Sequence, residues 1–508
     1  MRSFLVLILV GTLGFLAGCG SSGTPVGVVT SITLTPSSAS VDAGQSVNIT
    51  ASVANDSSGK GVSWSLTGAG TLSSQTTTGV TYTAPNPVTS ISLPSVVATS
   101  IASSSVTAST PIVIAPAGTV ANVAPISVDG GPLVPSTIYT NAAFVSVLLC
   151  APSNGACQTI PNILVDTGSF GLRVLASEVT VPLSPLTDTN GNTLYDCVQF
   201  VDNSFLWGAV APANIVVGAE LAASTSVQII ANPSFSIPSG CSGTNEDTQL
   251  LLGANGILGV GPEPFDCGLA CDPSAGGTAP AVYYLCGSGG SCSTTFVSCG
   301  ALCSDANANQ QVTNPVFNFP ADNNGTILTL QAVNDVAATV PGSLTFGIGT
   351  ESNNALPSTA TLFTLNSADN FTTNFNGQAL TGSFIDSGSN GIFFPQINNL
   401  PNICADNNSW YCPPTTTAYT ATNVDPNNNS TSNTVNFSVD NFDTVTNANP
   451  NDAAFSNLAG PMGSGACSSS NTTACTFDWG LPFFYGRSVF TAIDGTTTPN
   501  GNGPFWAY

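Results

Sequence analysis

The sequence predicts an all-β protein. Short runs in which apolar and polar residues alternate recur along it, for example Val47-Asn48-Ile49-Thr50 and Val62-Ser63-Trp64-Ser65-Leu66. This period of two is typical of half-buried strands. Asn-Gly pairs, which favour the tight turns of hairpins, follow several such runs, among them Asn190-Gly191 and Asn376-Gly377. No long segment has the 3.6-residue period of an amphipathic helix, so we expect few helices.

The composition favours a folded chain with an acidic surface. Of its 508 residues, 42% are hydrophobic and only 6% are charged, which is enough apolar material for a large core. The basic residues are Arg2, Lys60, Arg173 and Arg487, and the net charge is -23. Such a charge argues against nucleic acid and anionic membrane surfaces as partners.

The chain has no histidine. This excludes a Ser-His-Asp triad, a Cys-His nucleophile pair and the usual zinc sites. Acid–base chemistry near neutral or acid pH must then use carboxylates. We expect no metal and no organic cofactor.

The N-terminus has the features of a targeting segment. Arg2 precedes an apolar stretch that is too short for a confident transmembrane helix. It ends in Leu16-Ala17-Gly18-Cys19, which resembles a bacterial lipobox, and a Gly/Ser-rich stretch follows. We expect a lipoprotein signal peptide at 1–18, lipidation of Cys19 and a tether at 19–27, on the bacterial cell envelope, with the outer membrane or cell surface favoured. An ordinary signal peptide is the alternative.

Cysteine usage predicts disulfide bonds. Without Cys19, fourteen of the 15 cysteines remain in an exported chain. We expect small loops closed by Cys150/Cys157, Cys404/Cys412 and Cys467/Cys475. A dense group could also suggest a metal cluster, but disulfides are favoured there too: Cys267, Cys271, Cys286, Cys292, Cys299 and Cys303.

Residues 28–116 form a block without cysteine that predicts a small antiparallel sandwich. Its Ile32-Thr33-Leu34-Thr35-Pro36, Ala43-Gly44-Gln45 and Val62-Ser63-Trp64 resemble bacterial immunoglobulin-like repeats. Adhesion or carbohydrate binding is one hypothesis. We favour a spacer, because the block has no cluster of exposed aromatic residues.

The remaining part of the chain, from about residue 120, is too long for one simple sandwich. The stretch Ile114-Ala115-Pro116-Ala117-Gly118 predicts the boundary before it. We expect two β lobes, at 120–335 and 336–508.

Two segments of this part are alike. Val165-Asp166-Thr167-Gly168-Ser169 and Ile385-Asp386-Ser387-Gly388-Ser389 each follow an apolar run, and each leads into a second apolar run. An Asp at the end of a strand is held rigidly, and the Gly after it lets backbone amides approach the carboxylate. We expect Thr167 and Ser387 to bond backbone beneath the site, and Ser169 and Ser389 to bond the carboxylates.

Two carboxyl groups brought together cannot both ionise easily, so they share a proton. The ionised member can activate a water as general base, while the protonated member polarises a carbonyl. Asp166 and Asp386 are therefore the candidate catalytic residues.

With its flanking elements, this pair resembles the pepsin-like, two-lobed aspartic peptidase family across about 120–508. Three further stretches carry the likeness: Asn255-Gly256-Ile257-Leu258-Gly259-Val260-Gly261, Gly342-Ser343-Leu344-Thr345-Phe346-Gly347, and Trp479-Gly480-Leu481-Pro482-Phe483-Phe484. The resemblance implies a two-Asp active site in the cleft between lobes, under a flap hairpin, with an extended polypeptide as substrate.

The sequence departs from that family at two places. The candidate flap carries Phe200, Val201 and Asp202 where a Tyr is usual, and Arg173 stands where an aromatic residue is usual. For Arg173 and Arg487 a buried structural ion pair is the plain interpretation. Arg173 could also contact substrate or lower the pKa of an Asp.

Two functional hypotheses follow. The first is a monomeric, lipid-anchored, extracytoplasmic aspartic endopeptidase that favours acid. The second is a catalytically inactive surface binding module of the same fold, or a structural cell-surface protein, which the missing flap Tyr favours.

Overall fold

A computed structural model of the chain confirms the all-β prediction, because strands dominate and the α-helices are short. The two α-helices in the described residues are α1 (Gln249–Leu252) and α2 (Phe442–Ala448). The structure describes residues 29, 31–152, 155–231, 235–271, 282–287, 289–295, 310–396, 401–464, 467–468 and 470–508. The predicted signal peptide, Cys19 and the tether lie outside these residues. Within them, no helix is long and apolar enough to cross a membrane.

The N-terminal strands form two sheets around a core of their own. The described strands are β1 (Ser31–Thr35), β2 (Ala39–Asp42), β3 (Ser46–Ala54), β4 (Val62–Thr67), β5 (Thr71–Ser73), β6 (Gly79–Thr83), β7 (Ser95–Ser100) and β8 (Thr107–Ala115). One sheet has the order β1-β3-β6-β5 and the other β2-β8-β7-β4. Alternate residues such as Ile49, Tyr82 and Val96 point into the shared core, which explains the period of two in the sequence.

A long sheet makes up much of the larger part. Its first strands along the chain are β9 (Val123–Val128), β10 (Ala143–Cys150), β11 (Cys157–Asp166), β12 (Phe170–Leu175), β13 (Thr193–Gln199), β14 (Ser204–Val217), β15 (Glu220–Ile230), β16 (Thr244–Asn245), β17 (Gly256–Val260), β18 (Tyr283–Cys286) and β19 (Cys292–Thr294). Later residues add β20 (Gly325–Leu330), β22 (Val340–Phe346), β23 (Leu362–Thr364), β32 (Ser488–Ala492) and β35 (Phe505–Ala507). Because β9 pairs with β22, strands from both sides of residue 335 share this sheet.

A second sheet of the larger part comes from later residues. In the described residues it has the order β28-β27-β24-β25-β31-β26-β30. Its strands are β24 (Phe371–Phe375), β25 (Gln378–Ile385), β26 (Ile392–Gln396), β27 (Thr417–Val424), β28 (Ser432–Val439), β30 (Ala459–Ser464) and β31 (Asp478–Trp479). Two small pairs complete the described strands, β21 (Val336–Ala337) with β29 (Ala454–Phe455), and β33 (Thr497–Thr498) with β34 (Gly501–Asn502).

The two sheets of the larger part repeat one local arrangement. In the first, β11 runs parallel to β17, and β12 returns antiparallel to the same strand. In the second, β25 runs parallel to β31, and β26 returns antiparallel to it. In both cases a strand, a short loop and a returning strand enclose a third strand from much later in the chain. This repeat places the loops that carry Asp166 and Asp386.

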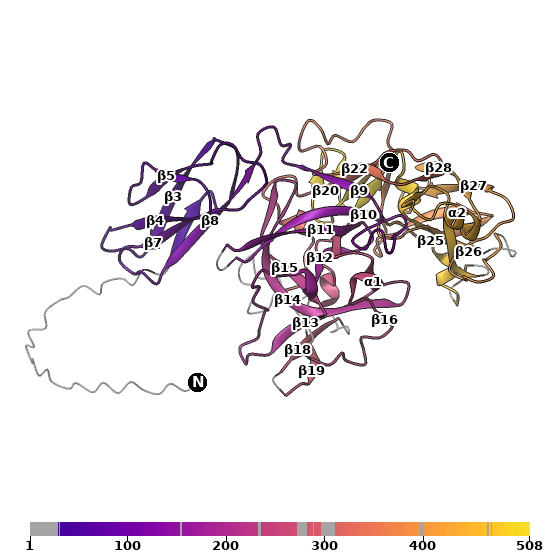
Figure 1. Cartoon of the computed structure of the whole chain (residues 1–508), viewed down its shortest axis with the longest axis horizontal. Coiled ribbons are helices and arrows are strands. Elements are labelled where there is room, and N and C mark those ends of the chain that lie inside the picture. The colour runs from indigo at the N-terminus through magenta and orange to yellow at the C-terminus, as the bar shows by residue number, and fades with distance from the viewer. Residues whose placement is uncertain are drawn as a thin grey trace, which may run out of the picture.

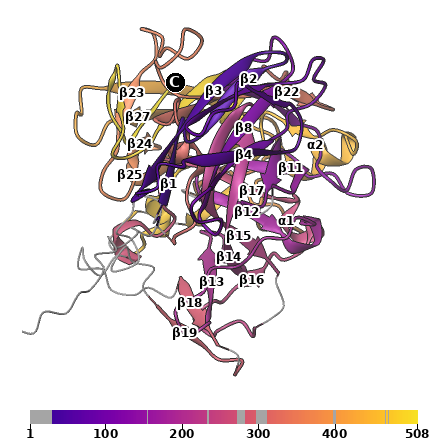
Figure 2. The ribbon, with the colours of Figure 1, turned by 90° about the vertical axis from the view of Figure 1, so that its left-hand side faces the viewer.

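The N-terminal block packs against the larger part. Leu93, Val113 and Ala115 from the block share an apolar cluster with Val216 and Leu221 of the long sheet. In Figure 1 the block lies to one side of the larger part, and in Figure 2 it lies in front. Burying these side chains stabilises the contact, so the block is fixed to the larger part along that side.

Disulfide bonds confirm the predicted use of the cysteines. The described residues contain Cys150–Cys157, Cys404–Cys412 and Cys467–Cys475, the three expected small loops. They also contain Cys197–Cys241, Cys267–Cys271 and Cys286–Cys292. Four cysteines of the dense group are thus paired with each other, while Cys299 and Cys303 lie outside the described residues.

Candidate active site

The loops after β11 and β25 meet face to face. A Cβ atom built on Gly168 would lie 2.6 Å from Cγ of Asp386, and one on Gly388 would lie 2.7 Å from Cγ of Asp166. Each carboxyl group therefore lies against the glycine of the opposite loop. Residues separated by 220 positions in the sequence come into contact because the two strand–loop–strand units face each other.

Each carboxylate is held by its own loop. The amides of Gly168 and Gly388 donate to Oδ1 of Asp166 and Asp386, both over 2.8 Å. The hydroxyls of Ser169 and Ser389 donate to Oδ2 of the same two residues. These bonds confirm the predicted role of the two serines and give both carboxyl groups the same fixed orientation.

The residues after the two Asp hold the loops together from beneath. The hydroxyl of Thr167 donates to the carbonyl of Ile385 over 3.0 Å, and that of Ser387 donates to the carbonyl of Val165 over 2.7 Å. Both side chains are buried, so these bonds satisfy backbone groups that water does not reach. The predicted bonds of these hydroxyls to backbone are confirmed.

Burial and mutual repulsion set the protonation of the pair. Burial raises the pKa of Asp386 well above its usual value, and the negative charge of Asp166 raises it further. A hydrogen bond with the side chain of Asp166 raises the pKa of Asp386 as well. One proton stays in the pair, on Asp386, at pH values where an ordinary Asp is ionised.

A cavity of about 910 Å³ opens onto the pair. The hairpin of β13 and β14 borders it, and its turn carries the three candidate flap residues. Phe200 is partly buried against an apolar cluster, and Val201 is 73% exposed. Asp202 accepts hydrogen bonds from the amide and hydroxyl of Ser204, which fixes the turn. All three line the cavity together with the pair.

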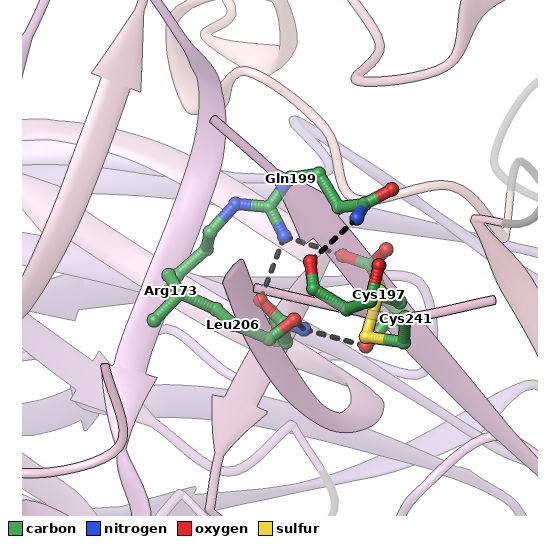
Figure 3. The surroundings of a disulfide bond; sticks show 8 residues. Arg173, Cys197, Gln199, Leu206 and Cys241 are labelled. Carbon is green, nitrogen blue, oxygen red and sulfur yellow. Dashed lines mark hydrogen bonds and ion pairs between the residues drawn. A yellow bond between two sulfur atoms is a disulfide. The ribbon is translucent and has the colours of Figure 1, made fainter. Parts of the chain in front are cut away.

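Arg173 forms a buried ionic cluster below this hairpin. It donates to Asp196 on β13, to Asp266 over 2.8 Å and to Gln228 on β15 over 2.7 Å. Figure 3 shows its guanidinium reaching the hairpin strands beside the Cys197–Cys241 disulfide. Burial would lower the pKa of Arg173, but the two carboxylates raise it above its usual value. The buried ion pair expected for Arg173 is confirmed, and it joins the Asp166 loop's return strand to the hairpin.

One cation serves two carboxyl groups in this cluster. Burial raises the pKa of Asp196 despite its contact with Arg173, and the neighbouring Asp266 adds to the increase. The hydroxyl of Tyr283 donates to Asp266 over 2.6 Å. The sequence offered one signal for this cluster, the scarcity of basic residues, but no pattern named Asp196, Asp266 or Tyr283 as partners.

Arg487 has different surroundings. Among the described residues it forms no ion pair; its guanidinium lies 4.6 Å from the ring centre of Phe483 and donates to that residue's carbonyl. The ion pair expected for Arg487 is therefore wrong. A ring face and a carbonyl take the place of a carboxylate.

A third carboxyl group beside the pair was missed by the sequence analysis. Asp478 on β31 lines the same cavity and is 1% exposed. It lies between Phe477 and Trp479, so a charged residue inside an apolar run was the available signal. Glu246 also lines the cavity, and burial, with Asp202 nearby, raises its pKa to about 7.

The one group of side chains near enough to hold a metal, within the described residues, is Cys404, Cys412 and Asp443. The two cysteines are bonded to each other, so they offer no thiolate to an ion.

The comparison with protein families gives a match over residues 118–508, to the family described as "Protein of unknown function (DUF3443)". The chain belongs to this family. No curated protein matches it. A solved structure, that of a DUF4784 family protein from Bacteroides caccae, is similar at 11% identity and a TM-score of 0.13. The match covers 42% of this chain and 59% of that one, and likeness at this level carries no argument about this DUF3443 member.

The family match overturns one sequence-based inference. The chain was expected to belong to the pepsin-like aspartic peptidase family, but the family whose model matches is DUF3443. The family assignment was wrong. It rested mainly on two short strand–loop–strand motifs, and the same local geometry can occur in more than one family.

Proposed function

We propose that this DUF3443 protein hydrolyses peptide bonds with a water molecule activated by Asp166 and Asp386. The observation that carries the proposal is the contact between two buried carboxyl groups in matched loops, one of which has a strongly raised pKa. Perturbed carboxyl groups that converge on a cavity favour an acid–base site.

The reaction uses the difference between the two carboxyl groups. Asp166 in its ionised form takes a proton from a water, and the resulting hydroxide attacks the scissile carbonyl carbon. Asp386 in its protonated form donates a hydrogen bond to the carbonyl oxygen, where negative charge develops. Collapse of the tetrahedral intermediate breaks the C–N bond, and the leaving amine takes up a proton from the pair.

The cavity favours an extended polypeptide. Its lining combines apolar residues such as Leu164 and Leu252 with polar groups at the pair. Of the described residues that line it, Arg173 is the one cation, and that cation is already paired with Asp196 and Asp266. An acidic cleft of this kind disfavours substrate segments rich in Asp or Glu.

We propose that the N-terminal block is an immunoglobulin-like sandwich that acts as a spacer. Its two sheets around one core support this, and its packing against the larger part makes the spacer a stiff one. Lipidation of Cys19 and attachment of a monomer to the bacterial cell envelope belong to the same proposal. The supporting observation is the lipobox-like sequence.

The hairpin supports a second candidate function, a binding module without proteolysis. The turn at Phe200, Val201 and Asp202 has no Tyr hydroxyl that could donate to a substrate. A cavity of this size can hold a peptide segment without cleaving it.

Digestion of a peptide library from strongly acid to neutral pH, analysed by mass spectrometry, separates the two functions. Cleavage that is lost in both Asp166→Asn and Asp386→Asn supports the hydrolase. The control is Asp42→Asn, the same chemical change at an exposed position of the N-terminal block. If the folded, disulfide-bonded protein binds peptides but cleaves none at any pH, the hydrolase proposal is wrong and the binding module stands.

A further inference from the structure

Asp478 has an unusual position for an acidic residue. It is 1% exposed, and among the described residues neither of its carboxyl oxygens makes a hydrogen bond. The basic residues of the described chain do not reach it, since Arg173 pairs with Asp196 and Asp266. A buried carboxyl group without partners is costly, so a retained one indicates a role.

The internal repeat shows what is different about this position. Leu164, two residues before Asp166, pairs with Ile257, and Phe384, two residues before Asp386, pairs with Asp478. Ile257 and Asp478 therefore occupy equivalent places, and both line the cavity. One half has an apolar side chain where the other has a carboxyl group, so the fold itself does not require an acid there.

Asp478 interacts with the loop that carries Asp386. Burial raises the pKa of Asp478 well above its usual value. The hydroxyl of Ser389, which donates to Asp386 over 2.9 Å, lowers the pKa of Asp478 in part, and the charge of Asp166 raises it further. A charged Asp478 would in turn raise the pKa of Asp386.

We propose that Asp478 is a positioning residue of the reaction centre, which in its neutral form donates to the Ser389 hydroxyl and so directs that hydroxyl toward Asp386. This inference deepens the proposed hydrolysis and rests on it for its consequence in the reaction. A chain Asp478–Ser389–Asp386 gives the two members of the pair different surroundings, because Ser169 in the other half has Ile257 near its loop in place of an acid.

The titratable groups that act on Asp478 within the described residues are Asp166 and Asp386. The neighbouring strand β26 supplies none, since its sequence is Ile-Phe-Phe-Pro-Gln. A shift in pH dependence after substitution of Asp478 can therefore be assigned to these three carboxyl groups.

The first measurement is the pH profile of kcat/KM for peptide cleavage by Asp478→Asn and Asp478→Ile, the latter copying the other half. We expect the alkaline limb to move to higher pH in Asp478→Ile, because the Ser389 hydroxyl is no longer directed toward Asp386 and the ionised form of Asp386 loses that hydrogen bond. Asp478→Asn, whose amide can still donate to Ser389, is expected to stay closer to the wild type. Asp478→Ile and Ser389→Ala are expected to be non-additive, since the effect passes through the serine. An unmoved alkaline limb in a folded Asp478→Ile protein overturns the proposal.

The second measurement needs no substrate, so it separates this inference from the proposed function. In the folded wild type at neutral pH, infrared difference spectra against Asp478→Asn are expected to show the loss of a protonated carboxyl band. If the wild type shows this band but cleaves no peptide, the hydrolase proposal is wrong, while the inference that Asp478 is neutral still holds. Absence of the band overturns the inference about Asp478.

Urea unfolding provides the matched control. A folded pKa above the unfolded one means that stability falls as pH rises from about 4, whereas Asp478→Asn has no such loss. The unfolding constant of the wild type, divided by that of Asp478→Asn, is expected to change by up to about tenfold per pH unit. Asp425, equally buried but bonded to Thr364 and Asn427, is the control, and Asp425→Asn is expected to lower stability at neutral pH. Parallel behaviour of the two variants contradicts the proposal.

Discussion

Thr167 and Ser387 exchange hydrogen bonds across the two halves of the site. The amide of Thr167 donates to the hydroxyl of Ser387 over 3.1 Å, and the amide of Ser387 donates to the hydroxyl of Thr167 over 2.9 Å. Each hydroxyl also donates to a carbonyl of the opposite strand, so each one both donates and accepts across the site. The distance between Asp166 and Asp386 is therefore set by the residues that follow them.

Removing either hydroxyl is expected to weaken this connection. Thr167→Val and Ser387→Ala each leave a buried amide without its acceptor, which costs about 1–3 kcal/mol in the free energy of unfolding. Because the two side chains share one network, the double variant is expected to lose less than the sum. Urea unfolding measures both effects.

Thr167→Ser is the matched control, since it keeps the hydroxyl and copies the second loop. We expect it to lie close to the wild type in stability. Ser46→Ala removes half of an exposed hydroxyl pair with Thr83 and serves as a surface reference. If Thr167→Val and Ser46→Ala lose the same free energy of unfolding, the central network contributes no more to stability than a surface hydroxyl pair.

The two loop glycines are expected to be intolerant of a methyl group. In Gly168→Ala the new Cβ would lie under 3 Å from three atoms of Asp386, so that carboxyl group must move. Gly388→Ala acts in the same way on Asp166. Overpacking of this kind costs about 1–3 kcal/mol, and separation of the pair removes the shared proton.

Thermal unfolding and peptide cleavage measure the two consequences. The control is Gly289→Ala, where the added Cβ meets nothing within 4 Å. If Gly168→Ala matches Gly289→Ala in stability and in cleavage, the close approach of the two loops is contradicted.

Cleavage is expected to decline as pH rises through the pKa of Asp386. The raised pKa keeps the proton that the carbonyl oxygen needs, and once that proton is lost both carboxyl groups are charged and the reaction stops. The same shift makes the folded state less stable as pH rises above the unfolded value, because the folded protein holds the proton more tightly. In Asp386→Asn this part of the pH dependence of unfolding disappears.

A profile of kcat/KM against pH, with unfolding midpoints at the same pH values, tests this. Constant cleavage from acid to alkaline pH would contradict the proton assignment. Asp42→Asn is expected to leave both curves unchanged, since Asp42 is exposed in the N-terminal block.

The sequence was informative where local patterns determine structure. Alternation predicted the strands, and the two Asp-(Thr/Ser)-Gly-Ser motifs predicted loops that do meet. Short cysteine spacings predicted three of the disulfides. In each case the relevant residues are near each other in the chain, or are repeated in a recognisable form.

What depends on distant residues could not be predicted. Asp196, Asp266 and Tyr283 reach Arg173 from three separate segments, and no spacing relates them. Asp478 became visible only when its pairing with Phe384 showed that it occupies the place that Ile257 has in the other half of the repeat. The family assignment failed for a related reason, since short motifs report local geometry and the whole chain decides membership.

The ionic cluster below the hairpin yields the last prediction. Arg173→Met removes the one cation between Asp196 and Asp266 and leaves two buried carboxyl groups facing each other. Breaking a buried pair in this way costs about 3–5 kcal/mol. The raised pKa of Asp196 allows this residue to hold a proton. The loss of stability is therefore expected to be smaller near about pH 4, the usual pKa of an Asp, than near about pH 7.

Urea unfolding at the two pH values measures this difference, and Lys60→Met, at an exposed position, controls for loss of a positive charge. Adding Asp196→Asn to Arg173→Met is expected to recover part of the stability at the higher pH, since one of the two charges is then absent. Cleavage is expected to fall with stability, because the cluster holds the hairpin that borders the cavity. A loss in Arg173→Met that is equal at both pH values, with no recovery in the double variant, would show that Arg173 contributes through packing alone.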